Sequence, residues 1–257
     1  MTFGVCGTMK LAGAAKEAGY AYMEVPVAVL RSKSDPEAEL AAIRSAGLGV
    51  DAMNCFFPGD VTLYGDEAVR KQVLSYAEEN VRLARLAGTK IMVIGSGKAR
   101  SVPPFLTKEE AFRSLAELVG AIAELASPYG ISLAVEPLNV NETNLVNTLA
   151  DGIRLSRAVG LPNVGCLADF YHVFMNGEPL AAFEELKPGE LIHVHIARPD
   201  PDRRVPGERD RAVTAAWGQL LRKTGYEGRI SLEGRLDAED PGKDVQNALP
   251  ELVRAFG

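Results

Sequence analysis

The segment ISLAVEPLNVNETN, residues 131–144, carries the pattern that decides the fold. Its apolar run from Ile131 to Val135 is typical of a buried strand, and it ends in the carboxylate of Glu136 before Pro137 stops the strand. A charge at the end of a buried strand costs free energy unless a partner compensates it. The sequence therefore predicts a strand whose last side chain has a specific task.

The same kind of run recurs along the whole chain, separated by helical patterns. The strand candidates are FGVC (3–6), YMEV (22–25), VDAMN (50–54), KIMVIG (90–95), ISLAVE (131–136), VGCLAD (164–169), IHVHI (192–196) and RISLE (229–233). Strict alternation of strands and helices indicates parallel strands with right-handed crossovers. Eight such units in 257 residues predict a single-domain (β/α)8 TIM barrel over residues 1–257. A doubly wound open sheet is the alternative, but GVCGTMK after the first strand is not its GxGxxG fingerprint.

The helical stretches carry their own start signals and periodic faces. One is predicted from Asp66 to Leu86, and another follows the capping box of Thr107 and Glu110. Asp35 opens an earlier helix, and the final helix closes the ring.

Composition excludes several functional classes. A net charge of −6 argues against a general nucleic-acid or membrane binder, because such proteins present a basic face. The N-terminus shows no signal pattern, and no apolar run is long enough to span a bilayer. The three cysteines, Cys6, Cys55 and Cys166, form no CxxC pair, so we predict buried free thiols in a reducing cytoplasm.

Barrel geometry assigns an inner and an outer face to each strand. Alternate residues point inward, and the carboxyl ends of the strands form the active-site face. In the last four strands the outer residues are apolar: Leu133, Val135, Val164, Cys166, Ile192, Val194, Ile230 and Leu232. The last inner residue of each is ionisable: Glu136, Asp169, His195 and Glu233.

Three converging carboxylates and one imidazole would repel each other without a cation. A divalent metal resolves this, and mostly oxygen ligands suit Mn²⁺ first, with Mg²⁺, Co²⁺ and Zn²⁺ as alternatives. The competing interpretation is that each residue is a separately satisfied polar group at the barrel mouth. Glu24 in YMEV is either a supporting carboxylate near the site or a member of an ion pair at the strand end. His193 is predicted to be a hydrogen-bonded core residue.

These residues are also where the chain resembles a known family. EPLNVNETNLVNT (136–148), LADFYH (167–172), HVH (193–195) and SLEGR (231–235) are similar to motifs of the xylose isomerase-like TIM barrels, in particular the ketose 3-epimerases. The resemblance implies that Glu136, Asp169, His195 and Glu233 hold the metal, that Glu136 and Glu233 are catalytic, and that Glu142 and His172 contact substrate.

The segment after the seventh strand departs from the ketose 3-epimerase pattern. HIARPDPDRRVPGERD replaces a run that brings an arginine to the substrate, and it looks more like the hydroxypyruvate isomerases. Arg204 is our first candidate for that arginine, with Arg198 or Arg203 as alternatives. In the loop GSGKARSVP (95–103), Arg100 and Lys98 either reach an anionic substrate group or form a solvated basic loop.

The resemblance implies a metal-dependent sugar isomerase or epimerase of carbohydrate metabolism, acting on a ketose or related hydroxy-ketone through a cis-enediolate. We expect 3-epimerisation, with aldose–ketose or hydroxypyruvate isomerisation as the alternative. A dehydratase on the same scaffold is a further alternative. An endonuclease IV-type phosphodiesterase is disfavoured, because the chain has only three histidines. The resemblance also implies a homodimer or homotetramer, although the sequence points to no interface.

Overall fold

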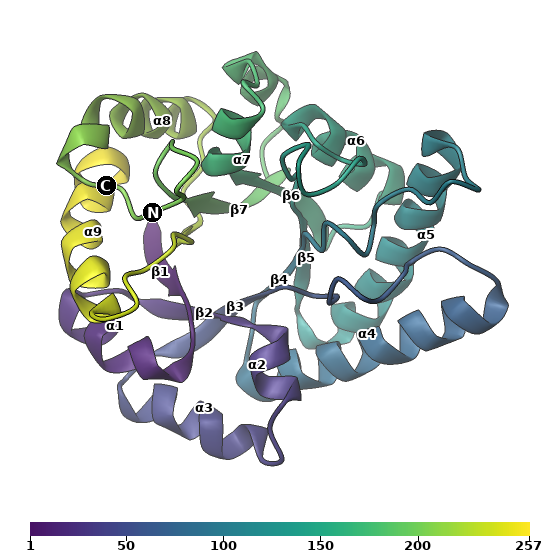
Figure 1. The fold of residues 1–257 in the computed structure, drawn as a ribbon, viewed down its shortest axis with the longest axis horizontal. Coiled ribbons are helices and arrows are strands. Elements are labelled where there is room, and N and C mark those ends of the chain that lie inside the picture. Colours follow the sequence, from purple (N-terminus) through teal and green to yellow (C-terminus); the bar gives the residue numbers. More distant parts are fainter.

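A closed barrel of parallel strands forms the centre of the molecule (Figure 1). The computed structural model describes all residues from Met1 to Gly257. The strands are β1 (Thr2–Cys6), β2 (Tyr22–Pro26), β3 (Gly49–Asn54), β4 (Ile91–Ile94), β5 (Ser132–Val135), β6 (Val164–Asp169), β7 (Leu191–Ile196) and β8 (Arg229–Leu232). They follow one another in chain order around the barrel, and β1 pairs with β8 to close it. The prediction of a (β/α)8 barrel is confirmed.

Helices surround the barrel on its outer side (Figure 1). They are α1 (Ala12–Ala18), α2 (Val27–Arg31), α3 (Pro36–Ser45), α4 (Glu67–Ala87), α5 (Lys108–Ala126), α6 (Leu149–Val159), α7 (Phe170–Met175), α8 (Arg211–Lys223) and α9 (Pro241–Phe256). Short 3-10 helices are η1 (Met9–Leu11), η2 (Ser127–Tyr129), η3 (Leu180–Glu185) and η4 (Glu208–Asp210). The last helix, α9, packs against both α1 and α8, so it closes the helical ring as expected. None of these helices combines the length and the apolar character needed to cross a bilayer.

Local capping explains where the main helices begin. The Asp66 side chain accepts from the backbone N–H groups of Ala68 and Val69, and Thr107 forms the predicted capping box with Glu110. These contacts satisfy N–H groups that have no partner inside the helix. The α4 helix then ends at Gly88, whose φ of 77° is in the left-handed region that glycine adopts without strain.

Two apolar layers stabilise the barrel. The larger lies between the strands and the helices, and the smaller fills the barrel interior. The interior layer consists of Tyr22, Ala52, Ile91, Val93, Ala134 and Leu167. The Tyr22 ring lies over Gly4 of β1, where any larger residue would collide with it. Above this layer the interior becomes polar, toward the carboxyl ends of the strands.

Two details of the sequence prediction need correction. Ile192 was predicted to face outward, but it packs against the interior layer because the pairing of β6 with β7 shifts by one residue beside it. The cysteines are free, but only Cys166 is fully buried. Cys55 is exposed, because β3 ends at Asn54 and the chain turns there with a φ of 52° at Cys55.

Candidate active site

The four predicted metal ligands meet at the carboxyl end of the barrel. Glu136 and Glu233 immediately follow β5 and β8, Asp169 is the last residue of β6, and His195 lies in β7. One ligand atom from each residue lies within 4.8 Å of the others. Glu136, Asp169 and His195 are buried, and Glu233 is half-buried. The structure therefore brings together the residues that the strand pattern selected.

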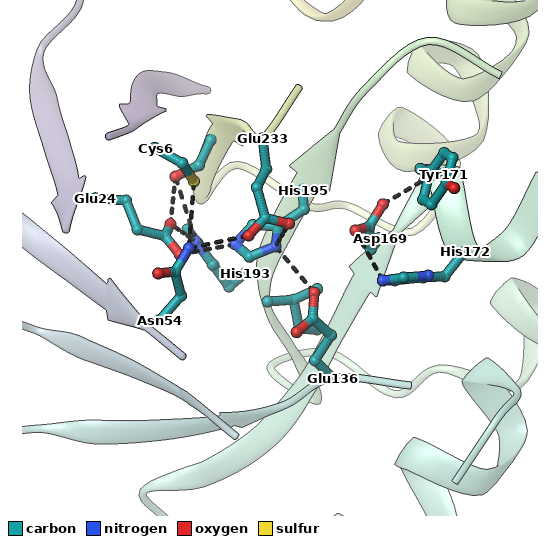
Figure 2. A network of polar contacts seen from close by, with 12 residues as sticks. Cys6, Glu24, Asn54, Glu136, Asp169, Tyr171, His172, His193, His195 and Glu233 are labelled. Carbon is teal, nitrogen blue, oxygen red and sulfur yellow. Dashed lines mark hydrogen bonds and ion pairs between the residues drawn. The ribbon is translucent and has the colours of Figure 1, made fainter. Parts of the chain in front are cut away.

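His195 lies at the centre of this cluster (Figure 2). Its Nδ1 atom is 3.0 Å from Oε1 of Glu136 and 3.1 Å from Oε2 of Glu233. The two glutamates come from different sides of the barrel mouth, as the ring of strands requires. Gly95, directly after β4, leaves the space for Glu136, because a Cβ atom there would collide with Oε2 of that carboxylate.

The two carboxylate oxygens of Asp169 have different roles, one in capping a helix and one in the cluster. Oδ1 accepts a hydrogen bond of 2.8 Å from the backbone N–H of Tyr171 and thereby caps α7. Oδ2 faces the cluster, 3.5 Å from Nε2 of His172.

An arginine supplies positive charge at the same place. Nη2 of Arg203 is 2.9 Å from Oδ2 of Asp169 and 2.5 Å from Oε2 of Glu233, and its guanidinium lies over the Tyr171 ring. The backbone of Arg203 has a φ of 50°. This residue is the one cation that bridges two of the predicted metal ligands.

The structure corrects our first choice of arginine. Arg204 points away from the cluster, where its Nη2 atom is 3.1 Å from Asp244 and 3.6 Å from Asp237. Arg198 pairs with Asp202 and Asp210. The backbone of Arg203 is in the left-handed region, with a φ of 50°, and its side chain faces the mouth while that of Arg204 does not.

Arg100 also differs from its predicted role. It is 1% exposed, and its guanidinium donates to the backbone carbonyls of Glu136 (2.8 Å), Val146 (3.0 Å) and Ile94 (3.3 Å). Burial lowers the pKa of Arg100 to about 10. No anionic substrate group can reach a side chain enclosed in this way, and Arg100 instead joins the end of β4 to the end of β5.

Glu142 and His172 lie beside the cluster, and Asn139 makes hydrogen bonds with both of them. Its side-chain amide is 2.8 Å from Oε1 of Glu142 and 2.9 Å from Nδ1 of His172. The backbone N–H of Asn139 also donates to Nδ1 of His172 at 3.2 Å, so the imidazole proton is on Nε2. The Nε2–H group of His172 is thus directed to the side of the cluster.

Sequence reasoning missed the supporting residues Asn54 and Asn139. Asn54 donates from Nδ2 to Oε1 of Glu233 at 2.9 Å (Figure 2). The sequence could have identified Asn54, because it is a polar residue at the end of a predicted strand, as the predicted metal ligands are. Asn139 lies in a polar loop and carried no comparable signal.

The two glutamates have opposite electrostatic surroundings. Burial raises the pKa of Glu136 above its usual value, although His195 opposes this effect. Burial also acts on Glu233, but His195 and Arg203 outweigh it and lower the pKa of Glu233 to about 2. Environments that push two carboxyl pKa values apart are typical of acid–base pairs.

Curated relatives of the chain act on sugars and related ketones. It is 28% identical over 230 residues to a D-psicose 3-epimerase from Agrobacterium fabrum, covering 84% of this chain and 75% of that one. It is 29% identical over 260 residues to a putative hydroxypyruvate isomerase from Streptomyces coelicolor, covering 94% and 90%. It is 32% identical over 140 residues to a 3-dehydro-D-guloside 4-epimerase from Escherichia coli, about half of each chain (54% and 52%).

Solved structures share the fold over the whole chain. A D-psicose 3-epimerase crystallised in the presence of D-fructose superposes with a TM-score of 0.85 at 22% identity, and each chain is covered completely. The IolI protein with a bound zinc atom gives a TM-score of 0.80 at 18% identity, covering 100% of this chain and 98% of that one. At these identities the likeness establishes the fold.

A family model extends the comparison to nearly every element of the barrel. The model that describes the xylose isomerase-like TIM barrel matches residues 12–254, from α1 to α9. The named relatives are epimerases and isomerases, and the chain belongs to the xylose isomerase-like TIM barrel family.

Proposed function

We propose that this protein is a divalent-metal-dependent sugar epimerase that inverts C3 of a ketose by proton transfer through an enediolate. The observation that carries the proposal is the placement of Glu136 and Glu233, whose carboxylates both lie about 3 Å from Nδ1 of His195 but come from different strand ends. Binding alone needs no such pair. The similarity to ketose 3-epimerases supports the choice of reaction.

The residues of the cluster fit a divalent cation. Glu136, Asp169, His195 and Glu233 would hold it, and their three carboxylates and one imidazole favour Mn²⁺, with Mg²⁺, Co²⁺ and Zn²⁺ as alternatives. When bound, such an ion stabilises the negative charge that develops on the substrate oxygens as the proton leaves.

Glu136 and Glu233 divide the proton transfer. One carboxylate removes the C3 proton from its face of the substrate, and the other, protonated, returns a proton to the opposite face. The configuration at C3 is thereby inverted, and the two carboxyl groups exchange protonation states. Gly95 gives Glu136 its space, and Asn54 and Arg203 hold Glu233 in place.

Three further residues would hold the substrate. The Nε2–H group of His172 can donate to a substrate oxygen, and Glu142 can accept from a hydroxyl, since its side chain is 41% exposed. Arg203 lies at the cluster, so we assign it the role first considered for Arg204. Its two contacts with Asp169 and Glu233 would be shared with the substrate.

Deuterium exchange tests this proposal. Protein loaded with Mn²⁺ is incubated in D₂O with a panel of ketoses, ketose phosphates and hydroxypyruvate, and deuterium is located by NMR, with an EDTA-treated control. We expect metal-dependent deuterium at C3 of a ketose. Deuterium at C1 or C2 would instead establish an aldose–ketose or hydroxypyruvate isomerase, and absence of both exchange and metal binding would overturn the enzymatic assignment.

A further inference from the structure

A fourth carboxylate lies directly beneath the three of the proposed metal centre and has no place in the mechanism above. Glu24, in the middle of β2, is completely buried. Its Oε1 atom is 2.9 Å from Nε2 of His195, and its Oε2 atom is 2.7 Å from Nε2 of His193 (Figure 2). The same Oε2 atom is 2.6 Å from Oγ of Ser231. One acid from the first half of the barrel therefore joins three polar residues of β7 and β8.

The partners of Glu24 show where the histidine protons are. Nδ1 of His193 is buried and has no hydrogen-bond partner. A buried donor without a partner is rare, so the proton of His193 is on Nε2 and is donated to Glu24. An ionised carboxylate only accepts hydrogen bonds, so Nε2 of His195 must likewise carry a proton. Nδ1 of His195 faces the carboxylates of Glu136 and Glu233, so a metal ion held by these carboxylates would take the place of the Nδ1 proton.

We propose that Glu24 is a positioning residue that fixes the ring orientation and tautomer of His195, so that Nδ1 is the nitrogen offered to the metal. The inference rests on the proposed metal centre. A metal ligand must present an unprotonated nitrogen, and a hydrogen bond to the other ring nitrogen determines which one is free. Ser231 and His193 in turn hold Glu24, so that its carboxylate has one orientation.

A direct metal-ligand role for Glu24 does not fit its contacts. Cys6, Glu24 and His195 lie close enough together to hold an ion. However, both oxygens of Glu24 are already engaged, one by His195 and the other by His193 and Ser231. The network also continues to the Tyr22 hydroxyl, 2.9 Å from Oγ of Ser231, in the apolar interior of the barrel. Glu24 therefore acts through His195.

The first experiment reads the tautomer in the unmodified protein. The chain has three histidines, so ¹⁵N-labelled protein loaded with diamagnetic Zn²⁺ gives few signals in a long-range ¹H–¹⁵N spectrum. We expect His195 to keep its proton on Nε2 with Nδ1 bound to the ion. A proton on Nδ1, or coordination through Nε2, would overturn the inference without any substitution.

The second experiment measures Mn²⁺ affinity by calorimetry in Glu24→Gln and in Asp51→Asn. Asp51 is a matched control, because it makes the same acid-to-amide change in a pair with Arg229 at the opposite end of the barrel. Glutamine can present only one accepting oxygen to three donors, so we expect the dissociation constant for Mn²⁺ to rise by about 10- to 100-fold. Asp51→Asn is expected to lower the melting temperature and leave the dissociation constant within about threefold, as distant sites act independently.

The outcomes separate this inference from the proposed function. If Glu24→Gln loses stability but binds Mn²⁺ as tightly as the unmodified protein, Glu24 is only structural and the inference fails alone. If the unmodified protein binds no divalent metal, the proposed function fails together with it. If Glu24→Gln does not fold, the tautomer spectrum of the unmodified protein still decides.

Discussion

The two halves of the barrel mouth are built from different kinds of residue. The ends of β5 to β8 carry four ionisable groups, Glu136, Asp169, His195 and Glu233. The ends of β1 to β4 contribute a thiol, an amide and a glycine, and their one carboxylate, Glu24, lies a layer deeper. The second half thus supplies the proposed chemistry, while the first half supplies the space and hydrogen bonds that place it.

This division explains why the site is asymmetric around His195. Glu233 has an amide from β3 and a guanidinium from the loop after β7, whereas the carboxylate of Glu136 has Gly95 from the end of β4 beside it. Residues in the first half of the barrel can therefore change the position and charge state of carboxylates in the second half without contacting a substrate. Substitutions in each half measure how strictly the division holds.

The largest effect is expected in the second half, from Glu136→Gln. The amide keeps the shape of the side chain but can neither take a proton from the substrate carbon nor return one to it, so kcat should fall by about 10²- to 10⁴-fold. The melting temperature should stay within a few degrees of that of the unmodified protein, which circular dichroism checks. An unchanged kcat would remove Glu136 from the mechanism.

The two neighbouring arginines give the next comparison. Arg203→Ala should lower kcat/KM by about 100-fold, because it removes a charged contact at the site, worth about 2–3 kcal/mol. Arg204→Ala, whose partners Asp237 and Asp244 lie outside the cluster, should stay within about threefold. Steady-state kinetics with the substrate found by deuterium exchange would test both, and the reverse order of effects would restore Arg204 as the substrate arginine.

In the first half, Gly95→Ala should act on catalysis through a single methyl group. The new Cβ atom meets the end of the Glu136 side chain, so the carboxylate must move while the backbone is unstrained. A displacement of about 1 Å lowers rates by up to about 100-fold, and we expect a loss of tens-fold in kcat. The matched control is Gly120→Ala on α5, where the added Cβ has ordinary contacts only. Equal activity of the two variants would show that Gly95 is not needed to place Glu136.

The smallest effect concerns a carboxyl group of the second half that lies outside the cluster. Glu178 accepts from the backbone N–H of Leu149 at the start of α6, and burial raises its pKa to about 7. A raised pKa means that the folded protein binds this proton more tightly, so the stability it confers is present below about pH 4.5 and is lost as the pH rises to about 7.

Glu178→Gln keeps an acceptor but does not titrate. Between pH 4.5 and 7 the unmodified protein should lose about 1 kcal/mol of unfolding free energy relative to this variant, a figure reduced for solvent screening of a part-exposed group. Urea titrations at both pH values measure the difference. If the unfolding free energies of the two proteins changed equally with pH, the raised pKa of Glu178 would be contradicted.

The sequence was sufficient for the barrel and for the convergence of its polar strand ends. The structure reproduces three local signals: the alternation of strands and helices, the helix starts at Asp66 and Thr107, and the inward direction of the last strand residues. These inward residues are Glu136, Asp169, His195 and Glu233. The choice between Arg203 and Arg204 depends on one backbone angle in a loop, which no periodic pattern reports. Arg100 was misjudged because its partners are main-chain carbonyls, and these are identical in every residue type.

Asp169 both caps α7 and faces the cluster, and this affects how duplicated genes for such a barrel would diverge. Because one of its oxygens caps α7, selection for folding alone would retain Asp169 in a copy that had lost its chemistry. Glu136 caps no helix, and its carboxylate contacts only His195 of the cluster. Under the proposed mechanism, a descendant that keeps Asp169 but has replaced Glu136 would be an inactive remnant, so Glu136 is the more informative residue for inspecting a genome.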